Sequence, residues 1–127
     1  MDITREELLD RAKQRITSLV EYDPKCEPAV PHTMALLDQI VLDGQPTPQP
    51  TWYDSGVEIS WLVNEWHVGF VIDPEGWYLW AERPDHTELF EVTGQPGILL
   101  KPEELRWTQH LLKEMGDQIA GSGMWKV

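Results

Sequence analysis

Apolar and polar residues alternate along residues 57–81 in a pattern that fits a β-meander with one register. A two-residue turn at Asn64-Glu65 pairs four apolar residues before it with four after it, all on one face. The turn at residues 73–76 returns a third strand on the same face, and a loop at residues 83–86 returns a fourth. The predicted inner face holds Val57, Ile59, Trp61, Val63, Trp66, Val68, Phe70, Ile72, Trp77, Leu79, Ala81, Phe90 and Val92.

Helical periodicity flanks this predicted sheet on both sides. Thr4 and Glu7 form a capping box before an apolar stripe, which predicts a helix over residues 5–20. A second helix is expected over residues 31–42, and a C-terminal helix over residues 101–120. The predicted fold class is α+β: two N-terminal helices, a four-stranded antiparallel β-meander and a C-terminal helix packed on the sheet.

The length of 127 residues fits a single domain with one core. Prolines at every second position from residue 46 to residue 50 indicate a stiff spacer between helices and sheet. The apolar runs are too short to cross a bilayer, the first residues do not resemble a signal peptide, and Cys26 has no cysteine to pair with. A cytoplasmic protein is therefore expected. Its predicted parts are a helical part (1–44), a proline-rich linker (45–52), the β-meander (53–93), the C-terminal helix (101–120) and a tail (121–127).

Acidic side chains are concentrated on the predicted sheet. The chain has a net charge of -12, and residues 54–91 hold nine acids against one base, Arg83. Such a field repels nucleic acid and anionic membranes and favours basic surfaces. We therefore expect no direct nucleic-acid binding and no membrane binding. Acidity that serves only solubility is the alternative interpretation.

The predicted register also gathers a set of residues on the outer face of the sheet. Gly69 falls opposite Trp80, whose indole can lie over the glycine backbone. His67 falls opposite Glu82, whose carboxylate can stabilise a protonated imidazole. Two interpretations stay open: a helix covers this face and its aromatics are core, or the face is exposed and binds a protein. The candidate binding residues are Trp80, Tyr78, Leu89, Glu58, Glu82, Glu91 and His67.

No motif for catalysis, for a cofactor or for a metal ion is recognisable. The four histidines lack paired ligand spacing, and a single cysteine excludes a cysteine-based zinc site. Neither a GxSxG sequence nor a glycine-rich phosphate loop is present. A carboxylate pair among the acids of the outer face is the one arrangement that could support an enzyme, a glycoside hydrolase. The sequence therefore predicts a non-catalytic protein without cofactor or metal.

Two segments of the sheet resemble a known group of proteins. The run from Pro50 to Trp61, followed by residues 71–76, is similar to small uncharacterised actinobacterial and actinophage proteins. Those proteins combine a proline-threonine lead, a glycine and a strand ending in tryptophan with a later turn from aspartate to glycine. The resemblance assigns no activity and no residue role, and it implies an accessory protein of a bacterium or its phage.

Together these observations predict an acidic protein-interaction module whose partner is another protein with a basic surface. A self-assembling homodimer and a nucleic-acid mimic are the alternatives. A domain that binds carbohydrates or cationic ligands through aromatic ring faces is a third alternative.

Overall fold

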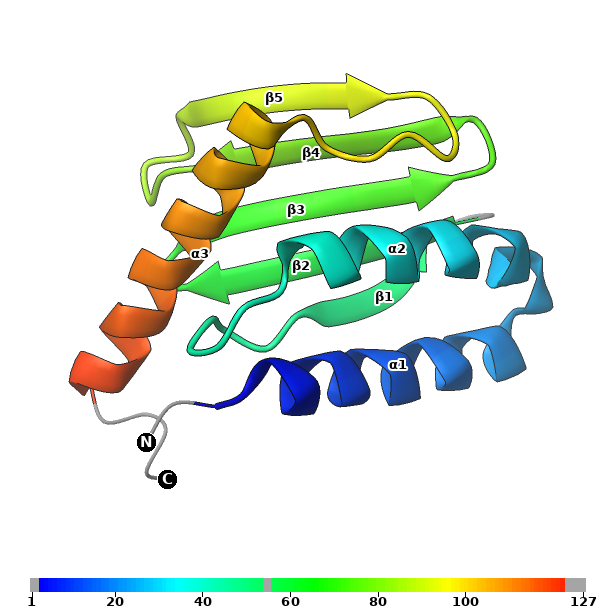
Figure 1. Cartoon of the computed structure of the whole chain (residues 1–127), viewed down its shortest axis with the longest axis horizontal. Helices are drawn as coiled ribbons and strands as arrows, with labels where there is room; N and C mark the ends of the chain where they lie inside the picture. The colour runs from blue at the N-terminus through cyan, green and yellow to red at the C-terminus, as the bar shows by residue number, and fades with distance from the viewer. Residues whose placement is uncertain (1–2, 54–55, 123–127) are drawn as a thin grey trace.

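The residues described by the computed structural model, 3–53 and 56–122, form an α+β fold (Figure 1). One antiparallel sheet holds its strands in the order β1-β2-β3-β4-β5. The elements are α1 (Arg5–Tyr22), the 3-10 helix η1 (Pro24–Ala29), α2 (Val30–Ile40), β1 (Gln49–Tyr53), β2 (Gly56–Val63), β3 (Trp66–Asp73), β4 (Gly76–Glu82), β5 (Glu88–Gly94) and α3 (Pro102–Ser122).

The predicted register of the central strands is confirmed. Val63 pairs with Trp66 at the first turn, and Ile72 pairs with Trp77 across the next hairpin. Asn64 and Glu65 both have positive φ angles, 49° and 70°, which suit a tight hairpin turn because its twist matches that of the strands. The predicted inner-face side chains of β2, β3 and β4 consequently share one face, where all of them except the half-buried Trp66 are buried.

The prediction of four strands, with a linker over residues 45–52, is wrong. Part of the predicted linker is β1, which pairs with β2 so that Pro50 lies opposite Ile59. Gln45 and all three prolines of the segment are buried. Proline is compatible with β1 because β1 is an edge strand, where one row of N–H groups needs no partner.

The predicted helices are present with small shifts of their ends. Thr4 Oγ1 accepts a hydrogen bond from the Glu7 amide at 3.2 Å, as the capping box requires. The Arg5 guanidinium then joins α1 to the end of α2, where Nη2 donates to the carboxylate of Asp38 at 2.6 Å and Nε to the carbonyl of Val41 at 3.1 Å. Of the predicted tail, residues 121 and 122 belong to α3, and residues 123–127 lie outside the described residues.

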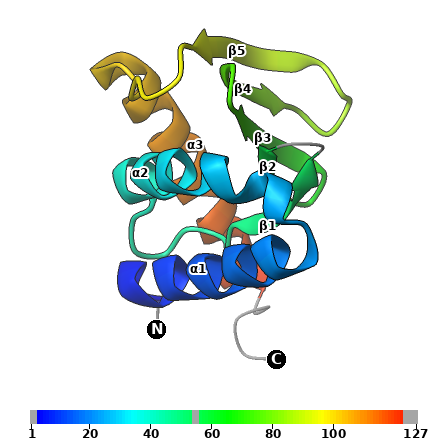
Figure 2. The same cartoon turned by 90° about the vertical axis from the view of Figure 1, so that its right-hand side faces the viewer.

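All three α-helices lie on one side of the sheet (Figure 2). The core lies between the two layers, and α3 adds the buried Leu112 and Met115. Gly116 of α3 packs so closely that a Cβ atom there would overlap the carbonyl oxygen of Gly44. No helix of the described residues is long and apolar enough to cross a membrane.

Trp77 fixes the loop after β5 to the inner face of the sheet. Its Nε1 donates a hydrogen bond to the carbonyl of Ile98 at 2.7 Å, and its ring lies 5.3 Å from that of Phe70. A Cβ atom on Gly94, which pairs with Trp77, would overlap the indole. The close glycine–tryptophan contact on this face therefore involves a ring that is buried and hydrogen-bonded.

Candidate functional site

The outer face of the sheet lies opposite the helices. Within residues 3–53 and 56–122, no helix or strand packs on this face (Figure 2). Leu62, which points to it from β2, is 66% exposed. Of the two interpretations of this face, the described residues support the exposed one.

Three aromatic side chains form a cluster at the centre of the outer face, which we call the aromatic cluster: His67, Tyr78 and Trp80. The Tyr78 and Trp80 rings are stacked, with centroids 5.4 Å apart and planes at 28°. The His67 ring meets Trp80 edge-on at 5.8 Å and 81°. Trp80 lies over Gly69, as the register predicted, and a Cβ atom there would overlap the indole. Because Gly69 has no side chain, the indole can lie directly on the backbone of β3.

A β-bulge changes the order of side chains on β5. Ala81 pairs with Phe90, but the next residue of β4, Glu82, pairs with Glu88, so Leu89 is the extra residue. Glu88 therefore points to the outer face, where strict alternation would have placed Leu89. Leu89 is half-buried and packs against the hydrophobic core. The prediction of Leu89 as an outer-face residue is wrong for this reason.

The bulge creates an acidic cluster beside the aromatic one: Glu82, Glu88 and Glu91. A hydrogen bond with Glu91, partial desolvation and the repulsion of both neighbouring carboxylates raise the pKa of Glu88. Partial desolvation, a hydrogen bond to Glu91 and the nearby carboxylates also raise the pKa of the Tyr78 hydroxyl. The carboxylates contribute to both shifts by repulsion, so the cluster has a local negative potential that a cationic group would neutralise.

Glu58 and His67 have other neighbours than the sequence suggested. Glu58 is level with Tyr78 but two strands away, about 10 Å across the sheet. It contacts Thr51 of β1 and stands apart from the acidic cluster. His67 is paired with Glu82 in register, yet its Nε2 lies 3.4 Å from Ser60 Oγ. The side chain near Glu82 is that of His86, with Nδ1 3.8 Å from the carboxylate.

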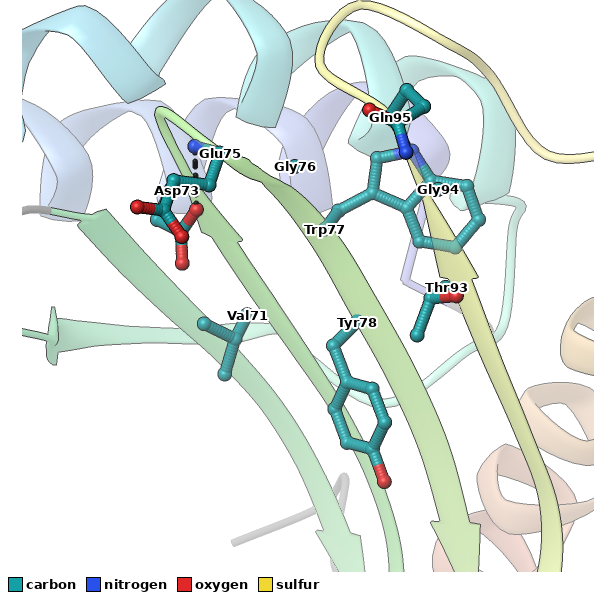
Figure 3. Close-up of a pocket in the computed structure, with 9 residues that line it drawn as sticks. All are labelled: Val71, Asp73, Glu75, Gly76, Trp77, Tyr78, Thr93, Gly94 and Gln95. Atoms are coloured by element: carbon teal, nitrogen blue, oxygen red, sulfur yellow. Dashed lines mark hydrogen bonds between the residues drawn. The ribbon is translucent and has the colours of Figure 1, made fainter.

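A shallow cavity of about 390 Å³ opens at the opposite end of β4 from the acidic cluster (Figure 3). Its walls come from the turn between β3 and β4 and from residues of three strands and the segment after β5: Val71, Trp77, Tyr78, Thr93, Gly94 and Gln95. The turn supplies the carboxylates of Asp73 and Glu75, and the Glu75 amide donates to Asp73 Oδ1 at 2.7 Å. Among the described residues, no lysine or arginine lines the cavity. The negative character of the outer face therefore extends to both ends of β4.

Sequence reasoning missed Glu88 and this cavity. The order acid-apolar-apolar-acid at residues 88–91 interrupts the alternation of β5 and is the local signal of the bulge. The cavity has no such signal, because its walls come from three strands and depend on their twist.

The titratable groups of the described residues do not form a metal centre. No group of three or more histidine, cysteine, aspartate or glutamate side chains in residues 3–53 and 56–122 could hold a metal ion. Cys26 is buried, and desolvation together with the charge of Asp23 raises the pKa of its thiol. Such a thiol is a poor nucleophile at neutral pH.

Comparison with protein-family models, with curated proteins and with solved structures yields no match to this chain.

Proposed function

We propose that this protein binds another protein, one with a basic surface, through the outer face of its sheet and without catalysing a reaction. The observation that carries the proposal is the uncovered aromatic cluster lying beside the acidic cluster. Tyrosine and tryptophan provide large, rigid contact areas and dominate the binding energy of protein interfaces. Carboxylates at the margin attract and orient a partner of opposite charge.

The parts of this face have separate roles. Tyr78 and Trp80 are the anchors. Their rings are stacked and half-buried, so they are already held in place and still present apolar area to a partner. Glu82 and Glu91, joined by Glu88, and the more distant Glu58 steer the encounter. His67 supports the indole of Trp80 by its edge-on contact. The net charge of -12 adds a long-range attraction to a basic partner.

The resemblance of residues 50–61 and 71–76 to small actinobacterial and actinophage proteins supports an accessory role. In that setting the partner would be a protein whose activity this one modulates. A partner that itself binds nucleic acid would make the acidic face a mimic of a phosphate backbone.

Affinity capture from the organism that encodes the chain tests the proposal. The wild-type protein is compared with a Tyr78→Ala, Trp80→Ala variant. Loss of two anchors, each worth about 2 kcal/mol, lowers affinity by about three orders of magnitude, so the partner should disappear. The matched control is Tyr22→Ala, Trp52→Ala, which removes a tyrosine that is 84% exposed and a tryptophan that is 49% exposed, both outside the outer-face clusters.

All proteins are first checked for cooperative thermal unfolding, and Tyr78→Ala alone serves if the double variant does not fold. Capture that survives loss of the anchors in a folded variant contradicts the proposal. If the control variant loses the partner to the same extent, binding depends on exposed aromatic side chains in general and not on the outer face, which also contradicts the proposal.

A further inference from the structure

The two edges of the sheet differ in their capacity to accept another strand. The β1 edge contains Pro50, which has no N–H to donate, and α1 runs alongside it (Figure 1). Its end is also tied down, because Trp52 Nε1 donates to the carboxylate of Asp23. β5 contains no proline. Within the described residues, no strand pairs with the edge of β5 that points away from β4. Alternate N–H and C=O groups along β5 therefore point away from β4, in the plane of the sheet, without a strand partner.

The two faces of β5 differ in chemistry. Glu88 and Glu91 stand on the outer face, as part of the acidic cluster. On the helix side, Phe90 and Val92 are only half-buried, so the core is incomplete there. Trp107 of α3 lies 6.3 Å from Phe90, ring to ring, and is 54% exposed, which continues the apolar surface beyond the strand.

We propose that the edge of β5 binds an extended segment of the partner as a sixth strand, with basic and apolar side chains alternating along that segment. This inference rests on the proposed function, because it states how the basic partner is held beside the aromatic cluster. Main-chain hydrogen bonds to β5 supply affinity, and the alternating side chains supply specificity. The basic residues of the added strand meet Glu88 and Glu91, and its apolar residues cover Phe90 and Trp107.

Charge decides between this occupant and a second copy of the chain. Antiparallel pairing of two β5 strands would bring two acidic clusters to one junction, between molecules that each carry a net charge of -12. Like charges across paired strands are destabilising, and opposite charges are stabilising. The raised pKa of Glu88 points the same way, since the local potential already opposes the ionised form. Acids on an edge strand thus exclude acidic strands and admit basic ones.

A synthetic peptide with acetylated and amidated ends, Lys-Val-Lys-Val-Lys-Val-Lys, is the probe. NMR of the isotope-labelled protein follows chemical shifts and amide hydrogen exchange during titration. We expect the largest shifts in residues 88–94 and at least a tenfold slowing of exchange for alternate amides of β5. A peptide with proline at the central position cannot complete the ladder, and one with glutamate in place of lysine is repelled. Both should leave exchange unchanged.

A charge reversal separates edge pairing from general attraction. Glu88→Lys, Glu91→Lys should weaken peptide binding at least tenfold. Glu21→Lys, Glu27→Lys changes the net charge equally at exposed positions on α1 and η1, and should reduce binding less than threefold. Equal effects of the two variants would overturn the inference, because the peptide would then respond only to net charge.

The remaining outcomes are also decisive. Shifts confined to residues 67, 78 and 80, with β5 exchange unchanged, overturn strand addition but keep the outer face as the binding surface. No binding at millimolar peptide overturns strand addition alone, because the capture experiment tests the proposed function separately. A concentration-dependent dimer that protects β5 amides would make a second copy the occupant and overturn the choice of a basic strand.

Discussion

Two glycine–tryptophan contacts on opposite faces of β4 predict different costs for the same substitution. Gly94→Ala and Gly69→Ala each place a methyl group where an indole now lies, that of Trp77 and that of Trp80. Neither glycine has a positive φ angle, so alanine adds no backbone strain at either position. The two rings differ in burial: Trp77 is buried on the inner face, whereas Trp80 is half-buried on the outer face.

For Gly94→Ala the ring of Trp77 is buried and hydrogen-bonded to Ile98. Overpacking costs about 1–3 kcal/mol, and a stretched or broken buried hydrogen bond adds about 1 kcal/mol. Alanine returns roughly 0.5–1 kcal/mol through lower backbone entropy in the unfolded chain. The midpoints of these ranges give a net destabilisation of about 2 kcal/mol, which lowers Tm by roughly 8 °C for a domain of this size.

For Gly69→Ala the ring of Trp80 can turn outward, because nothing in the described residues covers the outer face. The loss is then its contacts with Tyr78 and His67, about 0.5–1.5 kcal/mol each, less the same gain from alanine. The expected net cost is about 1 kcal/mol. In a Trp80→Ala background, Gly69→Ala should instead stabilise by about 0.5–1 kcal/mol, since no indole remains to be displaced and only the gain from alanine is left.

Urea denaturation of the wild type and the four variants measures these differences, provided that all of them unfold in two states with similar m-values. Equal costs for Gly69→Ala and Gly94→Ala would refute the argument. That result would mean that Trp80 is as tightly enclosed as Trp77, so the outer face could not be open.

Three further substitutions test the packing of the helices and the acidic cluster. Gly116→Ala should destabilise by about 2 kcal/mol or more in urea denaturation, because its methyl group would overlap the main chain at Gly44, which cannot move as a side chain can. Arg5→Ala should cost about 1–2 kcal/mol in the same assay, since it removes the hydrogen bonds of a partly exposed guanidinium to Asp38 and the end of α2. Glu88→Gln should raise Tm at pH 7, because the raised pKa means that folding disfavours the ionised carboxyl. The difference in Tm between the variant and the wild type should shrink as the pH falls through that raised pKa toward about 4.5, because the wild-type carboxyl then takes up a proton. Thermal unfolding across this pH range measures the difference, and an increase at lower pH would contradict the argument.

The central hairpins were predictable because two independent signals agree. The turn residues Asn64 and Glu65 set the register, and the same register pairs four apolar residues of β2 with four of β3 on one face. A shift by one residue would have exposed all of them, so no alternative pairing competes. The contact of Trp80 with Gly69 followed from this register without further information.

The errors arose where tertiary packing outweighs local pattern. The prolines before β2 look like a spacer, yet burial of their rings and one free row of hydrogen-bonding groups make them compatible with an edge strand. Leu89 fits an alternating strand equally well with or without a bulge, and the core contact that decides between the two is not local. Whether helices pack on one face or both depends on the path of the chain between them, which periodicity does not encode.

The proline in β1 also limits how far such a sheet can grow. Filaments built from sheet edges need two complementary edges on every molecule, so that each addition leaves a new place for the next. Within residues 3–53 and 56–122, the β1 edge carries Pro50 and is flanked by α1, so β5 offers the one edge without proline. Under the proposed strand addition, association through the sheet would therefore stop after a single addition. A complex formed at β5 as proposed would then contain one partner segment per molecule and would leave no matching edge for the growth of a fibre.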